Sequence, residues 1–210
     1  MDITVFCDSP NHPFLKIIGD WILSENSRIK LITDRNKLTG GEYLLLVSCN
    51  QILKKDVVSR YQHTLVMHAS DLPRGRGWSP YVWQILEGKN ELTLSLLVAE
   101  DDVDTGDIWH KIPVLISESD LFADINIKIF GAHIDMIKWL IESGGSITSY
   151  KQVGDSSYYK KRGPLDSEID TSDTIINQFN LLRVCDPDRY PAYFYHKGEK
   201  FLLKIEKVPL

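Results

Sequence analysis

The sequence of 210 residues has few of the features of a secreted, membrane-bound or nucleic-acid-coating protein. It contains only three cysteines, Cys7, Cys49 and Cys185, with no C-x-x-C spacing, so we expect reduced thiols and no disulfide framework. No apolar run approaches the roughly 20 residues that span a bilayer, and we expect no signal peptide. With 24 Lys and Arg against 29 Asp and Glu, the net charge of -5 disfavours a general nucleic-acid surface. We therefore predict a cytoplasmic protein with neither a nucleic-acid partner nor a membrane partner.

Short apolar runs alternate with helical patterns in the first two thirds of the chain. Continuous apolar runs typical of buried strands occur at 3–7, 29–33, 43–49 and 63–68. Further elements are expected as helices at 13–26, 78–88 and about 119–143, and as strands at 92–100 and 108–116. This alternation predicts an α/β fold with a doubly wound, mostly parallel, Rossmann-like sheet.

The character of the sequence changes after Gly145. Residues 149–170 are polar and rich in turn-forming residues. Residues 171–185 are predicted to form a helix capped by Thr171 or Ser172, and residues 192–205 a β-hairpin that turns at Lys197–Gly198. We therefore divide the chain into a sheet domain, 1–148, and a small C-terminal extension, 149–210, that packs on it.

Two residues that can carry acid–base chemistry follow predicted strands. His68 ends the strand at 63–68, and Asp104 lies in the acidic turn DDVDTGD. Ligands of open parallel sheets bind at the carboxyl ends of the strands, and we expect both residues at one such edge. Taken singly, a strand-end histidine is more often a packing residue, and an aspartate before Thr-Gly a turn residue. Together, the carboxylate would orient the histidine and favour its charged form, which can donate to a developing oxyanion.

The order of the motifs resembles that of the folate-dependent formyltransferases. The residues that carry the resemblance are HASDLP at 68–73, the Arg-Gly pairs at 74–77, Glu87-Gly88 and DTGD at 104–107, within a stretch from about Leu44 to Val114. The tail segments YYKKRGPLDSEID and LLRVCDPDRYPAYFYHKGEKFLLKI look like the branch that acts on nucleotide-linked amino sugars. The version around His68 is most similar to enzymes of pseudaminic-acid pathways.

The resemblance implies an enzyme that moves a formyl group from 10-formyltetrahydrofolate to the amine of a nucleotide-linked amino sugar, in surface-glycan biosynthesis and without a metal. Protonated His68 would stabilise the oxyanion, while Asp104 would orient it and help to remove the amine proton. One position departs from the family, which has asparagine where this chain has Val66. Asn50, after the neighbouring strand, is the candidate that replaces this donor, and an ordinary turn asparagine is the alternative.

The resemblance also implies the residues that contact folate and the acceptor. The expected folate contacts are Asn50, Gln51, Ile52, Leu53, Leu97, Ala99, Glu100, Asp101 and Asp104. The expected acceptor contacts are Ser9, Asn11, Ser70, Arg74, Lys160, Lys161 and Arg162. For the acidic loop and for the basic cluster, a solvated charged surface is the alternative.

Other acceptors and a second class of function stay open. A methionyl-tRNA acceptor is disfavoured because this chain is short and acidic, and glycinamide ribonucleotide because CDSPNHPF has no glycine to cradle a phosphate. Another amine, such as an aminoacyl substrate, is retained as an alternative. Val66 favours a different class, a formyltransferase-like protein that binds a nucleotide sugar without transferring formyl. A homodimer is left open.

Overall fold

A mixed six-stranded sheet organises the protein in a computed structural model, which describes residues 1–25, 29–145 and 147–208. In spatial order its strands are β2 (Ile29–Ile32), β1 (Ile3–Phe6), β3 (Gly41–Val47), β4 (Tyr61–His68), β6 (Glu91–Val98) and β7 (Ile108–Leu115). The first four strands run parallel, whereas β6 is antiparallel to β4, and β7 to β6. The predicted α/β fold with a mostly parallel sheet is confirmed.

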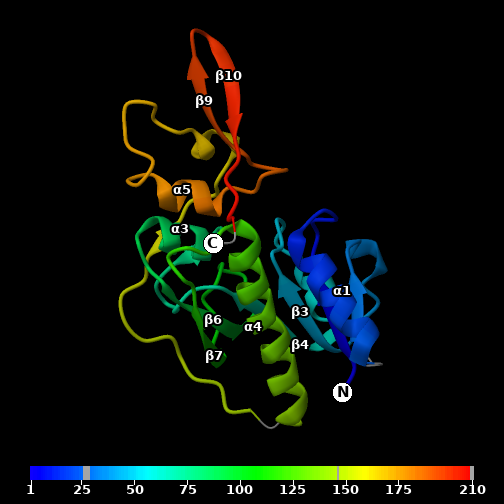
Figure 1. Ribbon diagram of the computed structural model, residues 1–210. Coiled ribbons are helices and arrows are strands. Elements are labelled where there is room, and N and C mark those ends of the chain that lie inside the picture. Colours follow the sequence, from blue (N-terminus) through cyan, green and yellow to red (C-terminus); the bar gives the residue numbers. More distant parts are fainter. Residues whose placement is uncertain (26–28, 146, 209–210) are drawn as a thin grey trace.

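The apolar strands are buried on both faces, which explains why they do not alternate with polar residues. Val5 and Leu45 belong to the cluster beneath α1 (Pro13–Glu25) and α4 (Phe122–Glu142), two helices that lie side by side (Figure 1). Phe6 and Leu44 belong to a second cluster, on the opposite face, with η1 (Arg35–Lys37) and α2 (Lys55–Val58) nearby. The predicted end of the first helix, Asn26, lies outside the described residues. Within those residues, every helix is too short or too polar to cross a membrane.

The segment after the sheet is attached to it at several points. Its elements are β8 (Tyr158–Tyr159), η2 (Pro164–Ser167), α5 (Phe179–Val184), β9 (Ala192–His196) and β10 (Glu199–Leu203). β8 pairs with β5 (Arg76–Gly77), and α5 packs on α4 and on α3 (Pro80–Leu86). The hairpin of β9 and β10 extends away from the sheet (Figure 1), and its turn at Lys197–Gly198, with φ of 49° and 85°, is the predicted one. The boundary at 148/149 stays a prediction.

The predicted helix at 171–185 is wrong in its first half. Only Phe179–Val184 is helical, and Thr171 and Ser172 lie in turns. The N–H and the hydroxyl of Ser172 both donate to Asp170 Oδ1, at 2.8 and 2.6 Å, which satisfies these groups without a helix. Ile176, at 81% exposed, has no apolar surface to cover, so nothing stabilises a longer helix.

Candidate functional site

His68 is the last residue of β4, and only 6% of it is exposed. Its Nε2 lies 2.7 Å from the carbonyl oxygen of Gly75. Because a carbonyl oxygen only accepts, Nε2 carries a hydrogen and donates it. Nδ1 is then the ring nitrogen that faces Asp104, 3.5 Å from Oδ2. The backbone of the loop after β4 therefore orients the ring.

Asp104 lies near His68, but the strand that precedes it runs in the direction opposite to the one expected. We expected both residues at one edge of a parallel sheet, but β6 runs antiparallel to β4, with Val98 opposite Leu65. The end of β6 thus lies beside a residue three positions before His68, and the β6–β7 loop must return along the sheet. Asp104 is 9% exposed, has a left-handed φ of 57°, and accepts the Gly77 N–H at Oδ2 at 2.8 Å. The structure brings the predicted pair together.

The two Arg-Gly pairs allow a close approach of backbone that other residues would prevent. Gly75 and Gly77 have φ of 76° and 96°, where residues with a side chain are strained. A Cβ on Gly77 would lie 2.4 Å from the carbonyl oxygen of Tyr159, and one on Gly75 would lie 3.0 Å from Ser70 Cβ. These glycines let the loop curl so that Gly75 accepts from His68 while Gly77 donates to Asp104.

Neither Val66 nor Asn50 supplies an amide to the histidine. Val66 is half-buried and packs with an apolar cluster that includes Leu72 and Leu97. The backbone N–H and the side-chain Nδ2 of Asn50 donate to the Asp8 carboxylate, at 2.8 and 3.2 Å. Asp8 follows β1, and β1 lies on the far side of β3 from the His68 strand. This arrangement contradicts the prediction that Asn50 replaces the family's asparagine, and its folate contact stays a prediction.

The two loops predicted to contact folate are joined by apolar packing. Leu53 is buried in one cluster with Ala99, which follows β6. The Gln51 N–H donates to Asp8 at 3.0 Å, and Ile52 is 64% exposed. Of these side chains, Ile52 therefore has the apolar surface that a flat ring could cover.

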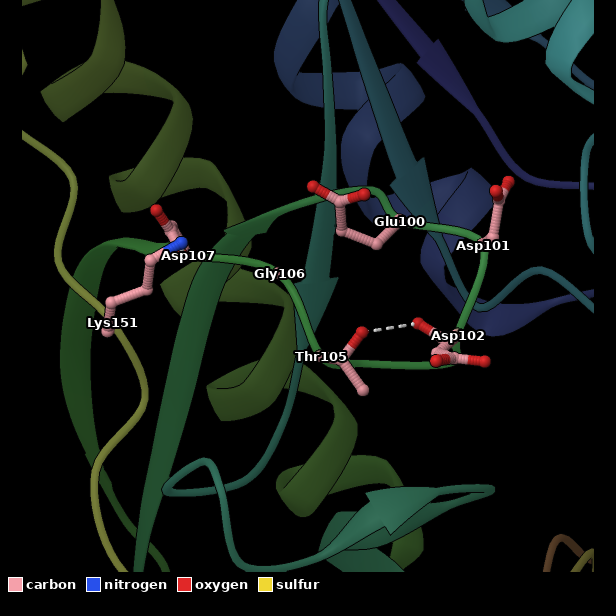
Figure 2. A pocket seen from close by; sticks show the side chains of 7 residues that line it. All are labelled: Glu100, Asp101, Asp102, Thr105, Gly106, Asp107 and Lys151. Carbon is pink, nitrogen blue, oxygen red and sulfur yellow. Dashed lines mark hydrogen bonds and ion pairs between the residues drawn. The ribbon is translucent and has the colours of Figure 1, made fainter.

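An acidic hollow of about 300 Å³ lies along the β6–β7 loop (Figure 2). It is lined by Glu100, Asp101, Asp102, Thr105, Gly106, Asp107 and Lys151. Leu97 is fully buried, so it lies behind the surface rather than on it. Across the described parts of the chain, no group of three His, Cys, Asp or Glu side chains could hold a metal ion. The carboxylates of the hollow can accept hydrogen bonds from N–H groups, and they repel anions.

The predicted basic cluster lies on the indole rings next to α3. Lys160 Nζ and Arg162 Cζ lie 5.7 and 5.3 Å from the Trp83 ring centroid, and Lys161 Nζ is 4.7 Å from that of Trp78. Cations over indole faces are stabilised by the ring quadrupole. The Lys160 ammonium also lies 3.6 Å from Asp166 Oδ1. The three cations are thus gathered on an aromatic surface, and part of their charge is already compensated.

The other predicted acceptor contacts differ in accessibility. Ser70 is 1% exposed, and its carbonyl oxygen accepts the Ser95 hydroxyl at 2.7 Å. Arg74 and Asn11 are exposed, and Ser9 accepts the His12 N–H in the turn before α1. Ser70 is therefore buried beneath the loop, like His68 and Asp104, and its acceptor contact stays a prediction.

A group of polar residues lies between α1, α3 and α4, and none of them is among the predicted site residues. Burial is the largest cause that lowers the pKa of His12 and of His133 to about 4, and Arg189 lowers that of His12 further. The Tyr81 hydroxyl donates to Asn126 Oδ1 at 3.3 Å, and burial raises its pKa to about 12. No sequence signal identified these residues, because they come from distant segments of the chain.

Comparison with known proteins identifies the family of this chain. The family model described as formyl transferase matches residues 20–135, more than half of the chain. A methionyl-tRNA formyltransferase from Clostridium botulinum is 28% identical over 85% of this chain and 59% of its own, so the chain spans about three fifths of that relative. The solved methionyl-tRNA formyltransferase from Clostridium thermocellum has a TM-score of 0.84 at 22% identity, covering 100% of this chain and 94% of that one. A sugar 3N-formyl transferase, solved in the presence of dTDP and 5-N-formyl-THF, has a TM-score of 0.64 at 19% identity over 88% and 78%. This chain belongs to the formyl transferase family.

Proposed function

We propose that this chain transfers a formyl group from 10-formyltetrahydrofolate to a primary amine, with His68 and Asp104 as catalytic residues. The observation that carries the proposal is the buried approach of His68 Nδ1 to within 3.5 Å of Asp104 Oδ2. Since Nε2 already donates to Gly75, a hydrogen on Nδ1 makes the ring an imidazolium that faces the carboxylate. Nδ1–H is then the donor of this pair that an incoming oxyanion can use.

The two side chains have complementary roles in the transfer. Bound 10-formyltetrahydrofolate supplies an activated formyl group. As the amine adds to the formyl carbon, Nδ1–H of His68 stabilises the negative charge on the formyl oxygen. Asp104 accepts the proton that the amine loses, directly or through a water. The new bond is the amide C–N bond, and the bond that breaks is the one from the formyl carbon to N10 of the folate. N10 keeps the electron pair and takes up the proton that Asp104 accepted, so that tetrahydrofolate leaves.

The fit of the folate to this chain is supported by the chemistry of the loops. The carboxylates of Glu100 and Asp101 suit the N–H groups of a pteridine, and the exposed Ile52 suits its flat face. The same carboxylates would repel the glutamate tail of a folate bound there. Asn50, Gln51, Leu53, Leu97 and Ala99 contribute backbone groups or packing behind that surface.

For the acceptor, we propose the amine of a nucleotide-linked amino sugar, in a cytoplasmic enzyme of surface-glycan synthesis. The support is the basic cluster of Lys160, Lys161 and Arg162, whose charges suit a diphosphate, beside indole rings that suit a base. This assigns catalysis to residues 1–148 and acceptor binding in part to the extension, 149–210.

An aminoacyl amine is the second candidate acceptor. The observation that favours it is the name of the sequence relative from Clostridium botulinum, a methionyl-tRNA formyltransferase. The net charge of -5 argues against a broad RNA-binding surface but does not oppose a small aminoacyl group. The names of the sequence relative and of the sugar 3N-formyl transferase structure thus suggest different acceptors, and an assay distinguishes them.

The decisive experiment is an acceptor panel assayed for release of tetrahydrofolate. It contains nucleotide-linked amino sugars with the amine at different ring positions, and methionyl-tRNA. His68→Ala and Asp104→Ala should each lower turnover about a hundredfold to a thousandfold, the usual loss for an oxyanion donor or its partner. Asp135→Asn, at an exposed position of α4, and His196→Ala, on the hairpin, are matched controls that should keep turnover. No release with any acceptor, while a nucleotide sugar still binds, would instead favour the non-catalytic class of function.

A further inference from the structure

The segment 150–160, which we call the strap, is tied to both loops that form the His68–Asp104 pair. At one end, Tyr150 and Ile108 exchange two backbone hydrogen bonds of 2.8 and 2.9 Å, just after the Asp104 loop. At the other end, the strap pairs with the loop after β4, because Arg76 N–H donates to Ser157 O and Trp78 N–H to Tyr159 O. One stretch of chain therefore connects the loop that carries Asp104 with the loop that orients His68.

Gln152 lies near the start of the strap, and both groups of its side-chain amide join the two loops. Its Nε2 donates to the carbonyl oxygens of Asp104 and Gly106, at 2.8 and 2.9 Å. Its Oε1 accepts from Arg76 Nη2 at 2.7 Å. The amide has one possible orientation, because arginine only donates and carbonyl oxygens only accept. Gln152 is thus a three-way connection between Asp104, Gly106 and Arg76.

The backbone that Gln152 holds is strained and must be held. Asp104 has a φ of 57°, a conformation that costs a residue with a side chain roughly 1–2 kcal/mol. On the other loop, Arg76 lies between Gly75, which orients His68, and Gly77, which donates to the Asp104 carboxylate. A second strap contact acts there, since the Ser157 hydroxyl accepts the Gly75 N–H at 2.9 Å. The separation of His68 and Asp104 is therefore determined by groups that the strap positions.

We propose that Gln152 is a positioning residue for the catalytic pair, and that the strap, although outside the sheet, maintains the geometry of the site. The residue does not touch the reacting atoms, because it acts through the Asp104 carbonyl and the Arg76 guanidinium. This inference rests on the proposed formyl transfer for its kinetic consequence. Its structural consequence, the environment of the His68 ring, does not depend on any activity.

The test compares two variants that keep the length of the side chain. Gln152→Met removes every hydrogen bond, and Gln152→Glu keeps the acceptor for Arg76 but presents no donor to the two carbonyl oxygens. Both should lower turnover about tenfold to a hundredfold at nearly unchanged KM, as expected when reacting groups shift by about 1 Å. Val153→Ser, at a neighbouring strap position that is 86% exposed, is the matched control and should keep turnover.

A second measurement separates positioning from a merely structural role. Long-range ¹H–¹⁵N spectra of the histidine rings report each tautomer in the ligand-free protein, and His133 serves as an internal reference far along the chain. We expect Gln152→Met to shift the His68 signals while those of His133 and the melting temperature stay close to wild type. Shifted His68 signals in a protein that transfers no formyl group would support positioning and reject the proposed reaction. Unshifted His68 signals, or an active protein whose turnover survives Gln152→Met, would overturn the proposal for Gln152.

Discussion

Gly77 offers a sharp test of the contact between the strap and the loop after β4. Replacing it by alanine places a Cβ 2.4 Å from the carbonyl oxygen of Tyr159, closer than a Cβ comes to a non-bonded atom of another residue. That oxygen is backbone, so it cannot swing aside without moving β8. Gly88 is a matched control, because its φ of 84° is similar and a Cβ there meets nothing within 4 Å.

The difference between the two variants can be worked out from these contacts. A left-handed alanine costs roughly 1–2 kcal/mol, and the lower entropy of the unfolded chain offsets about 0.4–1 kcal/mol of it. Gly88→Ala should therefore destabilise by about 1 kcal/mol. In Gly77→Ala the strap must also shift, which breaks the bonds from Trp78 N–H to Tyr159 O and from Arg76 N–H to Ser157 O. At about 1 kcal/mol for each bond, the loss rises to about 3 kcal/mol.

Equilibrium unfolding in urea measures both free energies, and tryptophan fluorescence is a suitable probe because Trp83 stacks on Tyr159 with centroids 6.1 Å apart. The comparison requires the same m-value in wild type and variants, so that the midpoints reflect stability alone. Equal destabilisation by the two alanines, within about 0.5 kcal/mol, would refute the close approach of Tyr159 to Gly77. It would also remove the physical reason given for the second Arg-Gly pair.

Three further predictions concern pH, the missing donor and the anchor of α5. Burial lowers the pKa of His133 to about 4 in the folded protein against about 6.5 unfolded, so the unfolded state binds the extra proton between these values. The free energy of unfolding should therefore decrease as the pH falls from about 6.5 towards 4, and this residue contributes up to roughly 1.4 kcal/mol per pH unit. In urea titrations at several pH values, the free energy of unfolding of His133→Phe should depend less steeply on pH than that of wild type. Val66→Asn introduces an amide two residues before His68. It should raise turnover tenfold or more and lower the free energy of unfolding by about 1–2 kcal/mol. Unchanged turnover would show that the lack of this donor does not limit the reaction. Arg183 is 2% exposed and donates to Ser117 O at 2.7 Å and to Asn90 Oδ1 at 3.1 Å. Arg183→Met should therefore lower the free energy of unfolding in urea by about 3 kcal/mol and make the extension sensitive to protease. The exposed control, Arg35→Met, should change that free energy by less than about 0.5 kcal/mol.

The local sequence pattern was sufficient to predict an element where its own residues indicate burial or a turn. The runs that became β1, β3 and β4 are mostly apolar because both of their faces are covered, and this burial can be predicted without knowing the neighbouring elements. The turn at Lys197–Gly198 was equally legible, since both residues have a positive φ and glycine adopts it without strain. The helix over 171–178 failed because its apolar residues have nothing to cover, which only the tertiary structure reveals.

The direction of a strand could not be predicted in this way. The run ELTLSLLV has the same composition and period whether it joins its neighbour parallel or antiparallel, and in the fold β6 runs antiparallel to β4. This reversal moves the Asp104 loop away from the expected edge. The pair was still predicted because the two motifs that contain it resemble those of the formyltransferases, whereas the groups that align the pair belong to neither motif. Gln152 is an ordinary polar residue in the sequence, and its function depends on a carbonyl oxygen about fifty positions away.

Because residue 66 is valine, His68 and Asp104 must stabilise the oxyanion without the amide donor that the family has at this position. His68 Nε2 is committed to the Gly75 carbonyl, so Nδ1–H is the donor that the ring can direct at an oxyanion. Asn50 is held by Asp8 beyond β3 and does not add a second one. An oxyanion accepts more than one hydrogen bond, and each donor is worth about 3 kcal/mol of transition-state stabilisation. With one donor, the reaction is expected to be slower by about a hundredfold than with two, and still far faster than without the pair. A slow transferase whose turnover rises in Val66→Asn is therefore the outcome that this geometry favours over a protein that only binds its ligand.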